Sequence, residues 1–288
     1  VGTSLPVPCA AGSYAPDSGM DHCMLCPAGG WCGGSARTAE SCPTGHYCPS
    51  GTGSPYQFPC PVGTYLTTTN RAEATDCTLC SAGHYCLKQG MNETSGFCRP
   101  GYFCTSGAST NDAKLGPHGG TAGPCPVGYH CPQATMFASE FPCAPGTYNS
   151  YEFQTNSSAC VPCAPGFSCP NYGQSASVRK CNLGYYCPEG CADDYCSNKA
   201  CSKETCPLEG YLGGGECPAG FICPGSDVRG TVFPAACAAG TYSPNSGRYY
   251  CLNCPPGHYC APATVEPLPC PAGRFCPTST DQNMPNCP

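Results

Sequence analysis

Apolar side chains are few and scattered along this chain, and they show no helical periodicity. Gly or Pro interrupts almost every short window, and both residues break helices. Stretches such as residues 63–69, which read Gly-Thr-Tyr-Leu-Thr-Thr-Thr, suit brief strands bounded by turns. The pattern therefore predicts short β-hairpins in an otherwise irregular chain, little or no helix, and no large apolar core.

Cysteine and glycine supply the regularity that the hydrophobic pattern lacks. Ten Cys-x5-Cys pairs carry glycine three residues after the first cysteine, as in Cys42-Pro-Thr-Gly45-His-Tyr-Cys48. Four more cysteines open a related unit with glycine at the same offset and tyrosine two residues later; these cysteines are Cys9, Cys60, Cys143 and Cys237, and the glycines are Gly12, Gly63, Gly146 and Gly240. Such a glycine marks a turn with positive φ or a close backbone approach that a Cβ would block. The motif therefore specifies a repeated fold unit.

The cysteine spacing also divides the chain into modules. A full module has a first cysteine, 13 or 16 residues, a Cys-x2-Cys, five residues, a cysteine and a further Cys-x5-Cys. The predicted parts are an inter-module segment at 1–8, modules at 9–59, 60–142, 143–236 and 237–286, and the start of a further module at 287–288. The second and third modules each carry an extra Cys-x5-Cys pair. Because modules of this size bury little alone, we expect them to stack as an elongated tandem array that continues beyond both ends.

Composition places this array outside the cytosol. The 33 cysteines among 288 residues exceed the level at which a secreted disulfide scaffold becomes the default interpretation. Sixteen disulfides, each contributing roughly 2–4 kcal/mol, would dominate the stability of the fold. No stretch approaches the roughly 20 apolar residues that cross a bilayer. We therefore expect an extracellular or cell-surface protein with no membrane segment in this chain.

The recurrent loops favour particular disulfides. Four loops of similar length enclose the same Gly-x-Tyr motif, which predicts the pairs Cys9–Cys23, Cys60–Cys77, Cys143–Cys160 and Cys237–Cys251. The Cys-x5-Cys pairs either close on themselves or cross with the next pair, and sequence alone cannot fix connectivity. The number of these pairs varies from module to module, so two-by-two crossing would leave one pair over. Local closure is slightly favoured.

Other cysteine and histidine chemistry is less consistent with the pattern. The Cys-x2-Cys elements resemble zinc or thioredoxin-like motifs, but six cysteines recur per module rather than four, and the composition offers no helix start. His46, His84 and His258 occupy a place that other copies fill with varied residues, which suggests exposed side chains. No acidic residue recurs beside them. We therefore predict no metal, no cofactor and no enzymatic activity.

One insertion interrupts the repeat between Cys191 and Cys206. Its cysteines are spaced by four residues, and it gathers charged residues in a chain that has few. A solvated loop with two disulfides is the main interpretation. The alternative is a surface that contacts a partner or binds a cation.

Two further features concern partners. Asn92 and Asn156 begin Asn-x-Ser/Thr sequons in longer loops, where N-linked glycans could project. The net charge of −6 without a basic run argues against nucleic acid or an anionic membrane as a partner.

The segments 270–276 (Cys-Pro-Ala-Gly-Arg-Phe-Cys) and 237–243, followed by the Cys-x2-Cys at 251–254, resemble ephrin-receptor-like cysteine-rich repeats. The loop at 9–23 is similar to the first loop of tumour-necrosis-factor-receptor modules. The resemblance implies tandem modules of receptors, matrix proteins or protist surface structures, including flagellar hairs and extracellular fibrils. Since the array is uniform, we expect an extracellular structural protein that self-associates, alone or together with other extracellular proteins, into a filament, fibril or surface coat. The alternative is the ligand-binding or adhesive ectodomain of a receptor.

Overall fold

The computed structural model describes residues 6–112, 114–115, 121–197, 214–225 and 230–283. These residues form two compact units. Unit 1 contains the described parts of Val1–Pro126, His130–Phe141 and Glu152–Asn156. Unit 2 contains those of Val127–Tyr129, Pro142–Tyr151 and Ser157–Pro288.

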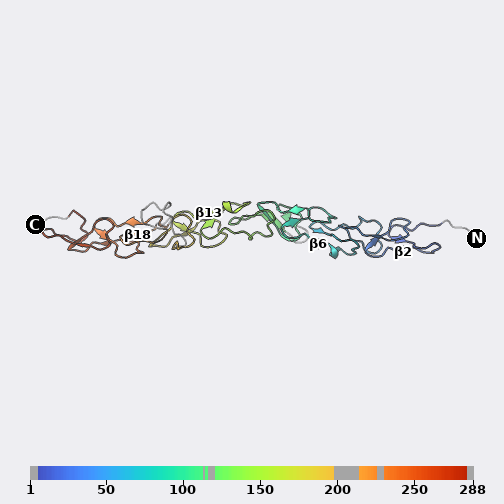
Figure 1. The fold of residues 1–288 in the computed structure, drawn as a ribbon, viewed down its shortest axis with the longest axis horizontal. Helices are drawn as coiled ribbons and strands as arrows, with labels where there is room; N and C mark the ends of the chain where they lie inside the picture. The colour runs from blue at the N-terminus through green and yellow to red at the C-terminus, as the bar shows by residue number, and fades with distance from the viewer. Residues whose placement is uncertain (1–5, 113, 116–120, 198–213, 226–229, 284–288) are drawn as a thin grey trace, which may run out of the picture. The chain divides into compact units, whose positions relative to one another are not determined.

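Both units consist of antiparallel hairpins whose strands are mostly two residues long (Figure 1). In unit 1 the pairs are β1 (Ser13–Tyr14) with β2 (Met24–Leu25), β3 (Gly30–Trp31) with β4 (Glu40–Ser41), β5 (Thr64–Tyr65) with β6 (Thr78–Leu79), and β7 (His84–Tyr85) with β8 (Gly96–Phe97). A three-stranded sheet in the order β10 (Lys114–Leu115), β11 (Thr121–Pro124), β9 (Tyr102–Cys104) completes it.

Unit 2 repeats the same hairpin. Its pairs are β12 (Thr147–Tyr148) with β13 (Val161–Pro162), β14 (Phe167–Ser168) with β15 (Arg179–Lys180), β16 (Tyr185–Tyr186) with β17 (Gly215–Glu216), β18 (Phe221–Ile222) with β19 (Ala235–Ala236), β20 (Thr241–Tyr242) with β21 (Leu252–Asn253), and β22 (His258–Tyr259) with β23 (Leu268–Pro269). Helix in the described residues is limited to the 3-10 turns η1 (Ala74–Asp76) and η2 (Ser157–Ala159). No helix in this part of the chain could span a membrane. The predicted class of small disulfide-rich repeats with short hairpins and little helix is confirmed.

Disulfides close loops that are local in sequence. The four recurrent hairpin loops are joined as Cys9–Cys23, Cys60–Cys77, Cys143–Cys160 and Cys237–Cys251. All ten Cys-x5-Cys pairs close on themselves, so the crossed alternative does not occur. Cys201, Cys206 and Cys287 lie outside the described residues.

Each of the fourteen glycine-bearing motifs forms one turn, which we define as the seven residues from its first cysteine to the position six residues later. Ten turns end in the second cysteine of a closed pair. In the four turns that begin a longer disulfide loop, the last position holds Ala15, Leu66, Asn149 or Ser243. The two kinds of turn make the same hydrogen bonds to their neighbours, as follows.

Successive turns are joined by a fixed set of backbone hydrogen bonds, which we call the ladder. In the step from the turn that begins at Cys26 to the turn that begins at Cys42, the Gly29 N–H donates to the carbonyl of Cys48 (2.8 Å). The carbonyl of Gly29 accepts from the Cys42 N–H (3.0 Å). This glycine-centred pair recurs at each turn glycine from Gly12 to Gly257. The glycine therefore lies at the centre of every contact between successive turns.

A second pair of bonds flanks the first in the same step. The Gly51 N–H, three residues beyond the second turn, donates to the carbonyl of Cys26 (2.9 Å). The Cys32 N–H donates to the carbonyl of Thr52 (3.0 Å). Each full ladder step thus contains four backbone hydrogen bonds. In this step the Ser50 hydroxyl adds a fifth bond to the carbonyl of Cys26 (2.9 Å), but most other steps lack it.

Unit 2 shows the same step with a turn that lacks the second cysteine. The Gly240 N–H donates to the carbonyl of Cys260 (2.8 Å), and its carbonyl accepts from Cys254 (2.9 Å). The Ser243 N–H, at the place of the second cysteine, donates to the carbonyl of Thr264 (3.0 Å). Because only backbone groups take part, a cysteine is not required at this place for the ladder to continue.

The turn glycines are required for two physical reasons. The glycines singled out by the sequence have positive φ values of 90°, 83°, 86° and 82° at Gly12, Gly63, Gly146 and Gly240. A second restriction is steric, since a Cβ on Gly45 would lie 2.2 Å from the carbonyl oxygen of Gly90, which follows the turn two steps along. This turn therefore packs on the next turn and on the next but one, as do the turns of Gly12, Gly128 and Gly240.

Half-cystines form most of the buried interior. The buried residues with apolar side chains are almost all cysteines, joined by Leu66, Tyr186 and two alanines. The buried polar residues include Thr52 and Thr135, whose hydroxyls donate to the carbonyls of Pro49 (2.6 Å) and Pro132 (2.7 Å). The fold is thus held by disulfides and main-chain hydrogen bonds rather than by an apolar core.

Candidate functional site

The clearest interruption of the repeat is the insertion that begins at Cys191. Cys191 follows Cys187 by four residues, the offset at which Thr52 follows Cys48. Its carbonyl still makes the ladder bond, accepting from the Cys169 N–H (2.9 Å). Its side chain instead forms a disulfide with Cys196. The insertion therefore begins at a regular ladder position whose side chain has been diverted into a small covalent ring.

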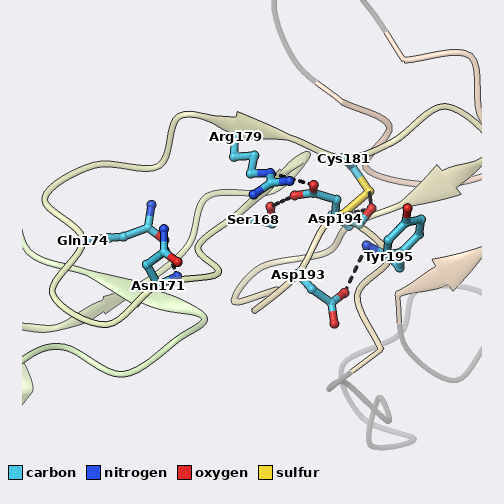
Figure 2. Close-up of polar contacts among 9 residues, drawn as sticks. Ser168, Asn171, Gln174, Arg179, Cys181, Asp193, Asp194 and Tyr195 are labelled. Atoms are coloured by element: carbon cyan, nitrogen blue, oxygen red, sulfur yellow. Dashed lines mark hydrogen bonds and ion pairs between the residues drawn. A yellow bond between two sulfur atoms is a disulfide. The ribbon is translucent and has the colours of Figure 1, made fainter.

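Asp194 anchors this ring to unit 2 (Figure 2). Its Oδ1 accepts a hydrogen bond from the Ser168 hydroxyl (2.5 Å), and its Oδ2 lies 2.6 Å from Nε of Arg179. Its side chain is only 10% exposed, whereas that of Arg179 is 59% exposed. One carboxylate thus contacts both partners from a nearly buried position.

A single hairpin presents both partners of Asp194. Ser168 in β14 pairs with Arg179 in β15, so the hydroxyl and the guanidinium come from directly opposite positions of the two paired strands. The carbonyl of Asp194 also accepts from the N–H of Asn182 (3.1 Å). The insertion is therefore fixed by side-chain and main-chain bonds together, and we call this arrangement the Asp194 seat.

Asp193, beside the seat, organises the next part of the insertion. Its carboxylate accepts from the N–H groups of Tyr195 (3.0 Å) and Ser197 (3.0 Å), and from the Ser197 hydroxyl. Partial burial acts to raise the pKa of Asp193, but the hydrogen bonds from Ser197 and Tyr195 outweigh it and lower that pKa. The ring of Tyr195 packs edge-on against Tyr185 with centroids 4.9 Å apart.

The described part of the insertion, up to Ser197, is not a freely solvated loop, because it is docked through the buried Asp194. The rest of the insertion, including Cys201 and Cys206, lies outside the described residues, so the interpretation of that part remains a prediction. Both carboxylate oxygens of Asp194 are engaged by Ser168 and Arg179. Within the described residues, no group of three or more Cys, His, Asp or Glu side chains is placed to hold a metal ion. The arrangement is suited to holding a loop in place.

The histidines differ from expectation. The rings of His46 and His84 are partly buried, with centroids 5.2 Å from Tyr56 and 4.7 Å from Phe97. The position that these histidines share varies among the copies because its partner ring, such as Tyr56 or Phe97, lies at the surface. Such a partner can pack against several kinds of ring or alkyl group.

The two sequon asparagines, Asn92 and Asn156, are exposed. Asn92 directly follows Met91, whose carbonyl accepts the ladder bond from the Leu66 N–H (3.0 Å). Three residues later the Ser95 N–H donates to the carbonyl of Tyr85 (2.8 Å). Asn92 therefore lies in a short arch that is clamped on both sides and open to solvent.

Sequence reasoning missed two groups of residues. One is the threonine four residues after the second cysteine, whose carbonyl accepts a ladder bond and whose recurrence was visible at Thr52, Thr135, Thr264 and Thr280. The other is the Asp194 seat, for which no local signal exists because Ser168, Arg179 and Asp194 are far apart in sequence.

No protein-family model and no curated protein matches this chain. The structure by itself shows that the chain consists of cysteine-rich repeats, each closed by its own disulfide and joined to the next by the ladder.

Proposed function

We propose that this chain is an extracellular structural protein, built of repeats of the ephrin-receptor-like kind, that forms a disulfide-stiffened rod and assembles into a filament, fibril or surface coat. The observation that carries the proposal is the ladder. The same backbone bonds recur from turn to turn in the described residues, so a contact surface on one turn recurs on the turns that follow. Recurrent surfaces favour open assemblies over closed rings.

The exposed surface offers suitable contact groups. Tyr56, Tyr151 and Tyr172 are each about 70% exposed, at 71%, 72% and 69%. Tyrosine supplies rigid contact area with a hydrogen-bonding hydroxyl and is enriched at protein interfaces. Only 10% of the residues are charged, so little electrostatic repulsion opposes lateral contact between copies.

The number of disulfides, which persist in oxidising compartments, supports a location outside the cytosol. In that setting Asn92 and Asn156 are proposed glycan sites, since both are exposed. Glycans at these positions would add hydrophilic surface to a chain with few charges.

Electron microscopy of the purified, glycosylated protein tests the proposal. Regular fibres that form at high protein concentration would support it. Analytical ultracentrifugation over the same concentrations should show a growing series of oligomers, whereas a single monomeric species throughout would overturn the proposal.

A receptor or adhesive ectodomain is the second candidate, favoured by the Asp194 seat. A loop fixed by a nearly buried carboxylate is a specific surface in an otherwise repetitive chain. This candidate predicts a monomeric protein whose binding to cells is lost in the Asp194→Asn variant. Binding that persists in this variant would count against it.

A further inference from the structure

Disulfides hold each turn or hairpin loop closed, whereas hydrogen bonds hold successive turns together. Every described disulfide joins cysteines that are 5 to 17 residues apart, within one turn or one hairpin loop. The links from turn to turn, such as Gly29 to Cys48, are backbone hydrogen bonds. In the described parts of both units, no disulfide joins one turn to the next turn. Until the linker between two turns is pulled straight, tension along the chain is therefore carried between them by hydrogen bonds and packing.

We infer that the chain is an extensible load-bearing element, in which tension separates ladder steps one after another while the disulfides stay closed and limit the extension. The inference rests on the proposed structural role, to which it adds a mechanical behaviour. This mechanical behaviour requires segments that can lengthen, segments that cannot, and turns that keep their structure when they are pulled apart.

The segments that can lengthen are the linkers between disulfide loops. Residues 33–41 lie between Cys32 and Cys42, and no disulfide encloses them. Once the bonds of this step break, the linker can straighten toward the roughly 3.3–3.6 Å per residue of an extended chain. The residues between Cys42 and Cys48 cannot do so, because their ends are held by a disulfide with a Cα–Cα distance of 5.9 Å. Each step therefore yields a limited, defined length.

Each turn should keep its structure when it is pulled away from its neighbour, so that the hydrogen bonds between the two turns can re-form. The Cys42–Cys48 disulfide and the positive φ of Gly45 are local features that do not depend on the neighbouring turn. Re-forming a step needs contacts between residues about one turn apart in sequence, and contacts of short sequence separation form quickly. Extension should therefore be reversible without any thiol–disulfide chemistry.

Single-molecule stretching of the full chain tests the inference, with handles attached at both ends through tags that contain no thiol. For the oxidised protein we expect several small extension events on pulling, and their return on relaxation. The disulfide loops enclose about half of the residues between Cys9 and Cys276, but each closed loop still contributes its Cα–Cα distance of 4.9–6.0 Å. A reductant should therefore increase the final extended length roughly 1.6-fold. An oxidised chain that shows no events before the handles detach, or one that reaches the reduced length, would overturn the inference.

A matched pair of variants identifies the ladder as the part that yields. Gly45 and Gly19 both have positive φ values, 77° and 85°, but a Cβ on Gly45 would lie 2.2 Å from a neighbouring carbonyl oxygen, whereas none of the described atoms lies within 4 Å of one on Gly19. Gly45→Ala should lower the force of the weakest events, and Gly19→Ala should leave the ladder events unchanged. An equal drop in both variants would contradict the assignment to the ladder.

The stretching experiment is independent of assembly, because it uses one molecule at a time. A protein that forms no fibres but yields in steps would refute the filament and retain the extensible element. A chain that forms fibres but does not yield in steps would retain the filament and refute the extensible element.

Discussion

The regular ladder step and the Asp194 seat both fix one chain segment on another, but they use different chemical groups. At the step between the Cys26 and Cys42 turns, four main-chain bonds carry most of the contact, and the Ser50 hydroxyl adds one bond. At the seat, the side chains of Ser168, Arg179 and Asp194 carry much of it. Apart from glycine, most side chains can therefore change without breaking the ladder. The contact at the Asp194 seat, by contrast, depends on which side chains are present. This difference explains how a repeat can vary in sequence without losing its geometry.

The largest expected effect comes from adding a Cβ to a ladder glycine. Gly184 and Gly51 have nearly the same φ, 82° and 83°, but a Cβ on Gly184 would lie 2.2 Å from the carbonyl oxygen of Gly247, whereas the nearest atom to one on Gly51, Cδ2 of Leu25, would be at an ordinary contact distance of 3.7 Å. We expect Gly184→Ala to destabilise the fold by roughly 3–5 kcal/mol and Gly51→Ala by only about 1–2 kcal/mol, the cost of the left-handed conformation alone. Urea denaturation of the oxidised proteins measures both. Equal losses would show that next-but-one packing contributes nothing.

Removing the charge of the seat should have the next largest effect. Asp194→Asn breaks the ion pair with Arg179 and should cost about 1.5–3 kcal/mol of local stability. Hydrogen exchange at the Asn182 amide, which donates to the Asp194 carbonyl, reports on this loss directly.

The neighbouring Asp193→Asn variant is the control, because the described hydrogen bonds of the Asp193 carboxylate, from Tyr195, Cys196 and Ser197, stay within the insertion. Exchange at Asn182 should be unchanged in this variant. Faster exchange in both variants would mean that the whole insertion, rather than the seat, protects this amide.

A smaller effect is expected at the ladder threonine. Thr52→Val keeps the shape of the side chain but removes the hydroxyl that donates to Pro49, for an expected cost of about 1 kcal/mol in thermal or urea unfolding. Thr52→Ser keeps the hydroxyl and should retain most of the stability. If serine proves as costly as valine, the methyl group rather than the hydrogen bond matters at this position.

The smallest expected effect is a pH dependence at His130. Burial lowers the pKa of this ring below its usual 6.5, and its Nδ1 is buried without a hydrogen-bond partner in the described structure. The unfolded chain therefore binds a proton more readily, so this contribution to stability is full above pH 6.5 and is lost as the pH falls through 6.5 toward the lowered value. His130→Phe should flatten this part of the curve of unfolding free energy against pH. An unchanged curve would exclude His130 as its source.

Much of the fold was predictable because its determinants are local. Glycine at a fixed offset and short cysteine spacings indicate a turn and its closing disulfide without any knowledge of distant contacts, as at Cys42, Gly45 and Cys48. The packing of Gly45 against Gly90 could not be predicted, because no sequence rule relates turns two steps apart. The same limit applies to the Asp194 seat, which depends on how the insertion folds back on β14 and β15.

The contact between each turn and the next but one also bears on how such a gene can change. When unequal recombination removes or adds one whole turn, every remaining glycine again faces an equivalent carbonyl two turns later, as Gly45 faces that of Gly90 and Gly184 that of Gly247. A deletion of part of a turn would set a Cβ or a linker against the glycine instead. Heritable length variation should therefore come in single turns of one Cys-x5-Cys pair, a finer unit than the six-cysteine module, as the extra pairs Cys125–Cys131 and Cys217–Cys223 already illustrate.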